Sequence, residues 1–281
     1  MQIIKDIKAL REILTSARLQ NKSIGFVPTM GALHEGHLSL IRRSKKENDL
    51  TVLSIFVNQM QFGPREDYRT YPRYKKNDCL FAKKEKVDII FYPSVDEIYP
   101  SGYLTYINVE KISDFLCGKS RPGHFQGVTT IVGKLLNIIQ PRVLYLGQKD
   151  AQQCVVLKQM VGDLNFPVTV KILPTIREAD GLAMSSRNQF LTRQGRQEAI
   201  YLYKALKLAK TKILKGKRHP TTIIKLMQSL IDKNTSGKID YIACVDSTTL
   251  APLKILKGEI LIALAVYFGK ARLIDNMLVR V

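Results

Sequence analysis

Short apolar segments rich in β-branched residues recur along the first 175 residues, and segments with helical periodicity separate them. Residues 51–57 (TVLSIFV) are the clearest case. Runs of this kind are typical of strands covered on both faces, and their alternation with helices favours a parallel sheet. We therefore expect a Rossmann-like α/β domain with ligands at the carboxyl ends of its strands. The expected strands are residues 23–27, 51–57, 88–92, 143–146 and 168–173, and the expected helices are residues 1–14, 37–48 and 128–139.

The pattern changes after about residue 176. Two helix-like segments come first and three short strand-like segments follow, which predicts a separate α+β domain rather than a continuation of the parallel sheet. The expected domains are residues 1–175, a Rossmann-like ligand-binding domain, and residues 176–281, a smaller α+β lid domain. The expected helices of the second domain are residues 192–214 and 221–232, and its strands are residues 240–245, 259–268 and 271–274.

The chain is strongly basic, with 44 Lys and Arg against 24 Asp and Glu and a net charge of +20 at pH 7. Such a charge can indicate binding to nucleic acid. However, the basic residues are spread along the whole chain, and aromatic residues are not interleaved with them as a stacking platform requires. We interpret the charge as a lysine-rich solvated surface that attracts small anionic substrates, and we expect no nucleic-acid partner.

The cysteines and the apolar segments indicate the cellular compartment of the protein. The four cysteines, Cys79, Cys117, Cys154 and Cys244, are scattered without CxxC spacing. This favours reduced thiols in a cytoplasmic protein, without a zinc site. Charges interrupt the N-terminal segment, which argues against a signal peptide, and the longest apolar run, residues 260–268, is too short to span a bilayer. We expect no membrane partner.

The segment with the most chemical information is residues 28–38 (PTMGALHEGHL), which follows a predicted strand and opens a predicted helix. The N-terminus of a helix presents unpaired N–H groups and a positive dipole end, both suited to phosphate. His34 and His37 are three residues apart, so both imidazoles can donate to one phosphate under attack. Two surface histidines are the alternative. Their position just past a buried strand favours phosphate handling.

This turn resembles the HxGH motif of the nucleotidyltransferase superfamily, which includes class I aminoacyl-tRNA synthetases. Further segments narrow the resemblance, because in order and at matching intervals they resemble the pantothenate synthetases from one end of the chain to the other. These segments are residues 56–63 (FVNQMQFG), 123–128 (GHFQGV), 146–153 (LGQKDAQQ), 184–188 (MSSRN), 240–241 (DY) and 269–272 (GKAR).

The resemblance implies a reaction in which ATP and (R)-pantoate form pantoyl adenylate and pyrophosphate. The amine of β-alanine then displaces AMP to give pantothenate. It also implies that ATP and Mg²⁺ are required, and that the protein is a homodimer formed through its N-terminal domain.

Each motif can be interpreted against that chemistry. Neutral amides such as Gln61 can donate to a carboxylate or hydroxyl without neutralising it. Lys149 can place a point charge on phosphates, and Arg187, in a loop that matches the KMSKS position of the superfamily, is a strong phosphate partner. Asp150 has alternative roles: it caps its own helix, or it contacts Mg²⁺ or the ribose.

The expected site residues follow from these motifs and from the resemblance. The catalytic set is His34, His37, Lys149 and Arg187. The set for pantoate and β-alanine is Met30, Asn58, Gln61, His124, Val128 and Gln153. The ATP set is Met30, Gly31, Ala32, Leu33, His34, Glu35, Gly36, His37, Gly147, Gln148, Lys149, Asp150, Ile176, Met184, Ser185, Ser186 and Arg187.

Two other functions remain open to test. A nucleotidyltransferase that transfers AMP or CMP to a phosphorylated acceptor would also use HxGH, but it would have no need for the amide-rich turn at Asn58 and Gln61. An RNA-binding module would account for the net charge. It predicts salt-sensitive RNA binding and indifference to pantoate.

Overall fold

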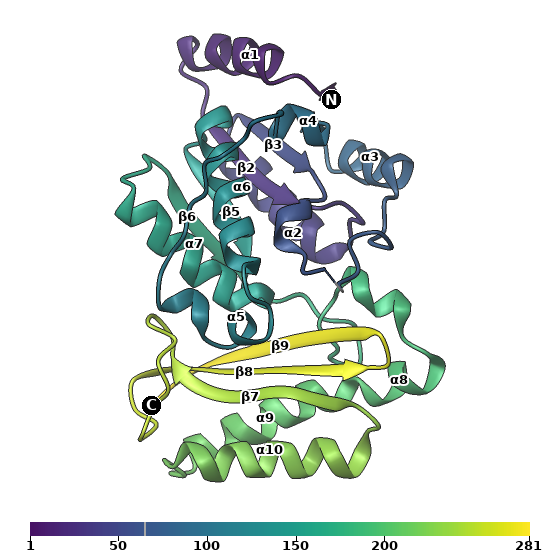
Figure 1. Ribbon diagram of the computed structural model, residues 1–281, viewed down its shortest axis with the longest axis vertical. Helices are drawn as coiled ribbons and strands as arrows, with labels where there is room; N and C mark the ends of the chain where they lie inside the picture. Colours follow the sequence, from purple (N-terminus) through teal and green to yellow (C-terminus); the bar gives the residue numbers. More distant parts are fainter. Residues whose placement is uncertain (65) are drawn as a thin grey trace. The chain divides into compact units, whose positions relative to one another are not determined.

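The computed structural model describes residues 1–64 and 66–281, which form two compact units (Figure 1). Unit 1 comprises Met1–Glu110, Arg121–Gly147 and Val156–Pro174, and unit 2 comprises Lys111–Ser120, Gln148–Val155 and Thr175–Val281. The predicted domain limit at residue 175 stays a prediction.

Unit 1 is built on a six-stranded parallel sheet with the order β1-β4-β3-β2-β5-β6. The central strands are almost wholly buried, as expected when helices cover both faces of a sheet. The order of the strands reverses at β2, which lies between β3 and β5, so the crevice at its carboxyl end is the expected ligand position. The strands are β1 (Gln2–Ile4), β2 (Ile24–Thr29), β3 (Leu50–Ile55), β4 (Ile89–Phe91), β5 (Val143–Gly147) and β6 (Thr169–Leu173).

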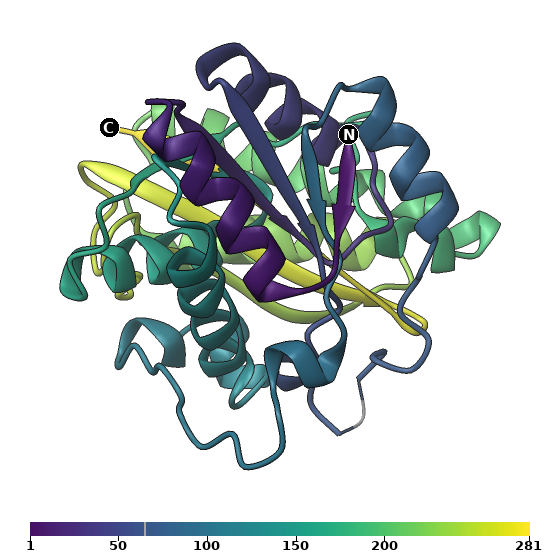
Figure 2. The same cartoon turned by 90° about the horizontal axis from the view of Figure 1, so that it is seen from above.

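Helices pack on the two faces of this sheet. Helix α2 packs against β2, β3 and β5, and α1 lies beside α6, as Figure 2 shows. The apolar core under α2 and α3 includes Val27, Leu53 and Tyr145. The helices and short 3-10 turns of this part of the chain are α1 (Ile7–Leu19), α2 (Glu35–Glu47), η1 (Gln59–Gln61), α3 (Lys75–Lys84), α4 (Val95–Ile98), α6 (His124–Ile139) and α7 (Ala151–Asp163), whose first residues belong to unit 2.

Unit 2 is built on an antiparallel sheet with the order β7-β8-β9. Helices α9 and α10 pack against each other and against this sheet, and residues such as Leu206, Met227 and Ile262 form the core there. A second apolar cluster joins Leu261 and Ala263 to Ile112 and Phe115. The elements are η2 (Ile112–Asp114), α5 (Cys117–Ser120), η3 (Gln148–Asp150), η4 (Ser186–Phe190), α8 (Arg193–Glu198), α9 (Ile200–Leu214), α10 (Pro220–Asn234), β7 (Lys238–Asp246), β8 (Glu259–Phe268) and β9 (Ala271–Arg280).

The predicted fold class is confirmed: a Rossmann-like parallel sheet and a smaller α+β part. Two elements were predicted wrongly. The expected helix at residues 192–214 is two helices, α8 and α9, which meet at Ala199, and residues 1–14 do not form a single helix. Gln2–Ile4 pairs with β4 as an edge strand, and α1 begins only after Asp6, whose carboxylate accepts a hydrogen bond from the Ala9 N–H at 2.7 Å. No helix in the described part of the chain is long and apolar enough to cross a membrane.

Candidate active site

The start of α2, just after β2, carries both predicted phosphate-binding histidines. His34 is the N-cap of α2, and its Nδ1 accepts from the Gly36 N–H at 3.2 Å, while Nδ1 of His37 accepts from the His34 N–H at 3.4 Å. Because Nδ1 accepts in each ring, the neutral imidazole carries its proton on Nε2. The ring centroids are 4.2 Å apart. The turn therefore brings together two Nε2–H donors at a helix N-terminus.

Glycine at position 36 makes room for the first of these rings. A Cβ there would lie 2.9 Å from Cε1 of His34. Space for the His34 ring is therefore one reason for a glycine at this position. Glu35 turns to the exposed face of α2, where it forms an ion pair with Arg42.

A buried carboxylate, which the sequence interpretation missed, holds the loop before the histidines. Asp78 of α3 is 2% exposed and accepts from the N–H groups of Ala32 and Leu33 at 3.1 and 2.8 Å. Burial raises the pKa of Asp78, and these two hydrogen bonds offset only part of the rise. Gly31, at a φ of +83°, approaches the same carboxylate closely. Two N–H groups of the predicted ATP loop are therefore already engaged by the protein.

The amides predicted to bind pantoate follow β3. Asn58 is 1% exposed, and its Nδ2 donates to the Gly127 carbonyl at 2.9 Å and to Oε1 of Gln61 at 3.2 Å. Nε2 of Gln61 donates to the Met30 sulfur at 3.1 Å. The structure thus brings Met30, Asn58 and Gln61 together at the carboxyl ends of β2 and β3.

Helix α6 approaches the same turn very closely. A Cβ at Gly127 would lie 2.3 Å from the Met60 carbonyl oxygen, so only glycine lets the two backbones meet. Val128 follows, buried on α6. Met30, the other apolar residue of the predicted pantoate set, contacts Gln61 of the same turn.

His124 and Arg121 hold the main chain of Gln61. His124 Nε2 lies 3.0 Å from Arg121 Nη1, and because an arginine only donates, Nε2 accepts and Nδ1–H donates to the Gln61 carbonyl at 2.7 Å. Arg121 also forms a two-bond pair with Glu66 at 2.6 Å. Burial raises the pKa of Glu66, but the hydrogen bonds and charge of Arg121 outweigh it, so the pKa lies below its ordinary value.

In unit 2, a side chain from β9 supports the turn that carries Lys149. Nδ2 of Asn276 donates to the Gln148 and Lys149 carbonyls at 2.9 Å each, and Nε2 of Gln148 donates to Oδ1 of Asn276 at 3.1 Å. Lys149 Nζ is 3.4 Å from the half-exposed Asp150 carboxylate. Gly147, at the end of β5, leads into this turn.

The predicted Ser-Ser-Arg loop is also in unit 2. Ser185 caps η4 by accepting from the Arg187 N–H at 3.2 Å, with Ser186 as the first residue of that turn, and Met184 donates its N–H to the Ile176 carbonyl at 3.0 Å. Beside Ile176, Arg177 pairs with the buried Asp275 at 2.6 and 2.9 Å. Burial raises the pKa of Asp275, although Arg177 opposes this.

Two neighbouring glutamines at the start of α7 differ in environment. Gln152 is buried, accepts from the Cys117 N–H and donates to the carbonyls of Ile112 and Phe115. Gln153, the predicted pantoate residue, is only half-buried. Gln152 is thus structural, and Gln153 is the more accessible of the two.

The motifs near the C-terminus are structural as well. Arg272 pairs with Asp240 at 2.6 Å and lies 3.5 Å from the sulfur of Cys117, which is 3.3 Å from the Tyr241 hydroxyl. These contacts connect β7, β9 and α5.

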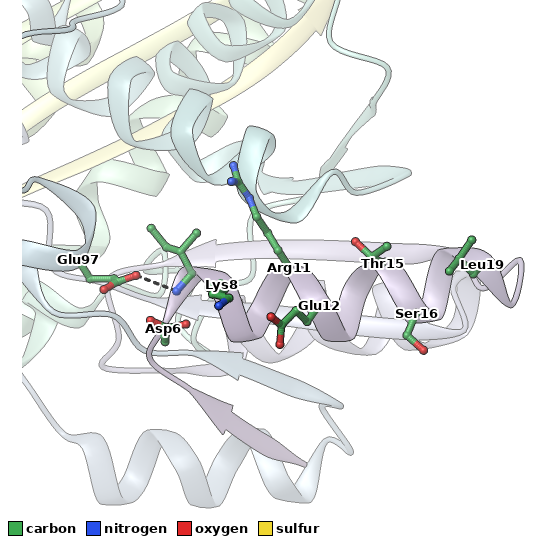
Figure 3. Close-up of a pocket in the computed structure, with 9 residues that line it drawn as sticks. Asp6, Lys8, Arg11, Glu12, Thr15, Ser16, Leu19 and Glu97 are labelled. Carbon is green, nitrogen blue, oxygen red and sulfur yellow. Dashed lines mark hydrogen bonds between the residues drawn. The ribbon is translucent and has the colours of Figure 1, made fainter.

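A hollow of about 670 Å³ lies elsewhere, on the outer face of α1 (Figure 3). Side chains of both charges line it, including Asp6, Arg11 and Glu12, and Glu97 accepts from the Ile7 N–H at 2.8 Å. None of the predicted site residues lines this hollow.

Comparison with known proteins settles the family. A family model described as pantoate-beta-alanine ligase matches residues 2–278. The chain belongs to the pantoate-beta-alanine ligase family. It is 53% identical to the pantothenate synthetase of Caldicellulosiruptor bescii over 279 residues, which cover 99% of each chain, and 50% identical to that of Moorella thermoacetica over 281 residues, which cover 100% of this chain and 99% of the relative.

Solved structures of this family have the same fold. Pantothenate synthetase from Thermus thermophilus matches with a TM-score of 0.94 at 41% identity over 99% of each chain. Pantoate-beta-alanine ligase from Francisella tularensis, described as complexed with beta-gamma ATP and beta-alanine, matches with a TM-score of 0.82 at 40% identity, covering 99% of this chain and 97% of that one. The predicted family and the prediction of a ligase are confirmed.

Proposed function

We propose that this ligase joins pantoate to β-alanine through a pantoyl-adenylate intermediate. A pantoate carboxylate oxygen attacks the α-phosphorus of ATP, the bond to the bridging oxygen breaks, and pyrophosphate leaves with the electron pair. The β-alanine nitrogen then attacks the acyl carbon, AMP leaves, and the amine proton passes to solvent. Family membership supports the overall reaction.

The observation that carries the first step is the pair of Nε2–H donors on His34 and His37. A carboxylate is already a competent nucleophile, so the protein must align the reactants and stabilise charge on the phosphoryl group. His34, His37, Lys149 and Arg187 would do the latter, and Gln61, Gln153 and His124 would contribute on the pantoate side. Asn58 would act through Gln61, because its own amide is engaged within the protein.

Mg²⁺ would enter with ATP. Magnesium is commonly held by substrate phosphates and one or two carboxylates. Within the described residues no group of three or more His, Cys, Asp or Glu side chains gathers to hold a metal, which is consistent with an ion carried by the nucleotide. The Asp150 carboxylate, half-exposed beside Lys149, is the proposed protein contact for the ion.

We further propose that the protein is cytoplasmic and forms a homodimer.

The test is AMP release with ATP, pantoate and β-alanine. His37→Ala should lower the rate of adenylate formation by about 100-fold or more, because one stabilising donor is lost, while ATP affinity changes little. Lys149→Ala should act similarly. Rapid-quench measurement of pyrophosphate, with ATP affinity measured separately, checks both.

His219→Ala is the matched control, because His219 precedes α10, far along the chain from every predicted site residue. Wild-type turnover in His37→Ala would refute the role of His37. A nucleotidyltransferase would instead release no AMP that depends on both pantoate and β-alanine.

A further inference from the structure

A chain of hydrogen bonds runs from Tyr99, just after α4, to the amide of Gln61. The Tyr99 hydroxyl donates to Oδ1 of Asn58 at 2.9 Å, and Nδ2 of Asn58 donates to Oε1 of Gln61 at 3.2 Å. Nε2 of Gln61 then faces the Met30 sulfur at 3.1 Å. Tyr99 was not among the residues that the sequence singled out.

The hydrogen bonds also fix which end of each amide faces where. The Met60 N–H can only donate, and it points at Oδ1 of Asn58 at 3.3 Å, while the Gly127 carbonyl can only accept, and it faces Nδ2. Asn58 is therefore oriented without ambiguity, and it presents N–H to Gln61. Oε1 of Gln61 must therefore accept this hydrogen bond, so the N–H groups of Gln61 face Met30.

The ring of Tyr99 is held as firmly as its hydroxyl. It is 9% exposed, it contacts Tyr103 edge-on at 5.1 Å between centroids, and it lies 6.1 Å from Phe56. A ring packed on two sides can deliver its hydroxyl in one direction only.

We propose that Tyr99 is a positioning residue that sets the amide of Gln61, through Asn58, with its N–H groups toward pantoate. The inference rests on the proposed function, since it assumes that Gln61 binds pantoate. Without the Tyr99 hydroxyl, Oδ1 of Asn58 keeps only the longer bond from Met60, so the Asn58 amide is held less firmly and the Gln61 amide is turned over in a larger share of molecules. A turned Gln61 presents its carbonyl oxygen, which repels the carboxylate of pantoate.

The experiment is steady-state kinetics of Tyr99→Phe in the wild type and in a Gln61→Ala background. We expect the KM for pantoate to rise about tenfold in the wild-type background, the size of effect expected for one buried hydrogen bond, with the KM for ATP unchanged. In the Gln61→Ala background, the same substitution should change the pantoate KM by less than about twofold, because coupled residues are not additive.

Tyr103→Phe is the matched control. It removes a hydroxyl from the adjacent ring, and within residues 1–64 and 66–281 that hydroxyl forms no hydrogen bond. An unchanged pantoate KM in Tyr99→Phe, or an equal rise in both backgrounds, would overturn the proposal. A parallel rise in both KM values with a lower melting temperature would also overturn it, since that indicates a role in folding only.

Failure of the proposed function itself would be seen earlier and separately. Wild-type enzyme that releases no AMP in response to pantoate would refute both the reaction and this inference before any variant is measured.

Discussion

Asp78 shows how a single side chain shapes the loop before the histidines. Its carboxylate offers an oxygen to each of two adjacent N–H groups, those of Ala32 and Leu33. A buried charge is costly unless hydrogen bonds satisfy it, so this one is retained where the conformation of a loop depends on it. The loop enters α2 with its backbone already fixed.

Asp78→Asn should therefore disturb both stability and activity. An amide has one oxygen, so its NH₂ group would face one of the two N–H donors and leave that donor unsatisfied. We expect a loss of about 1–3 kcal/mol in the free energy of unfolding, and slower adenylate formation. Urea denaturation and pyrophosphate release measure the two effects.

Asp96→Asn, on the exposed face of α4, is the control and should change neither quantity. If Asp78→Asn unfolds at the wild-type urea concentration and keeps wild-type turnover, the carboxylate does not hold the loop.

At the scale of elements, the last turn of α2 is tied to the sheet through Glu47. This carboxylate accepts from Lys171 of β6 at 2.8 Å and from the Tyr145 hydroxyl of β5 at 2.7 Å. These two hydrogen bonds, that from Lys171 first, lower the pKa of Glu47 to about 2. The ionised form is thus favoured in the folded protein, and α2 gains stability from it.

The stability that the Glu47 carboxylate contributes should depend on pH. A lowered pKa adds stability above the unfolded value of 4.5, and this is lost as the pH falls toward about 2. Glu47→Gln should therefore melt below the wild type at neutral pH, and the gap should narrow as the pH falls below 4.5. Melting temperatures across this range test it. Glu12→Gln, at an exposed position of α1, is the control variant, and a pH-independent gap for Glu47→Gln would contradict the assignment.

Elements with a strong local pattern were predictable, and those set by partners distant in sequence were not. Residues 51–57 are recognisable as a buried strand, and β3 lies there. The strand predicted at residues 271–274 extends to Arg280 as β9, because Arg177 and Gln148 satisfy the polar side chains of Asp275 and Asn276, which look like the start of a turn.

The residues of the candidate site also fall into those that a local motif predicts and those that it does not. Short motifs carry His34, His37 and Gln61, so the sequence was sufficient to select them. Asp78 and Tyr99 act on residues more than forty positions away, at 46 residues for Asp78 and Ala32, and 41 for Tyr99 and Asn58. A polar residue in an ordinary helix or loop gives no local signal of such a partner.

At the scale of the whole molecule, the net charge of +20 should act on charged substrates from a distance. A positive field speeds the encounter with an anion, and salt screens it. We expect kcat/KM for ATP to fall several-fold between about 20 mM and about 300 mM NaCl, because ATP is highly negative.

β-Alanine supplies the internal control, since it is a zwitterion without net charge. Its kcat/KM should change little over the same range. An equal fall for both substrates would show that salt acts on the enzyme itself rather than on the encounter.

The contact between Gly127 and the Met60 carbonyl also limits how this protein can change over generations. The smallest possible side chain would already collide there, and the obstacle is backbone that no rotamer change can move aside. A lineage could alter position 127 only after the turn at 59–61 had shifted, and such a shift would first displace Gln61. Every replacement of the glycine at position 127 therefore requires a variant in which Gln61 has already been displaced.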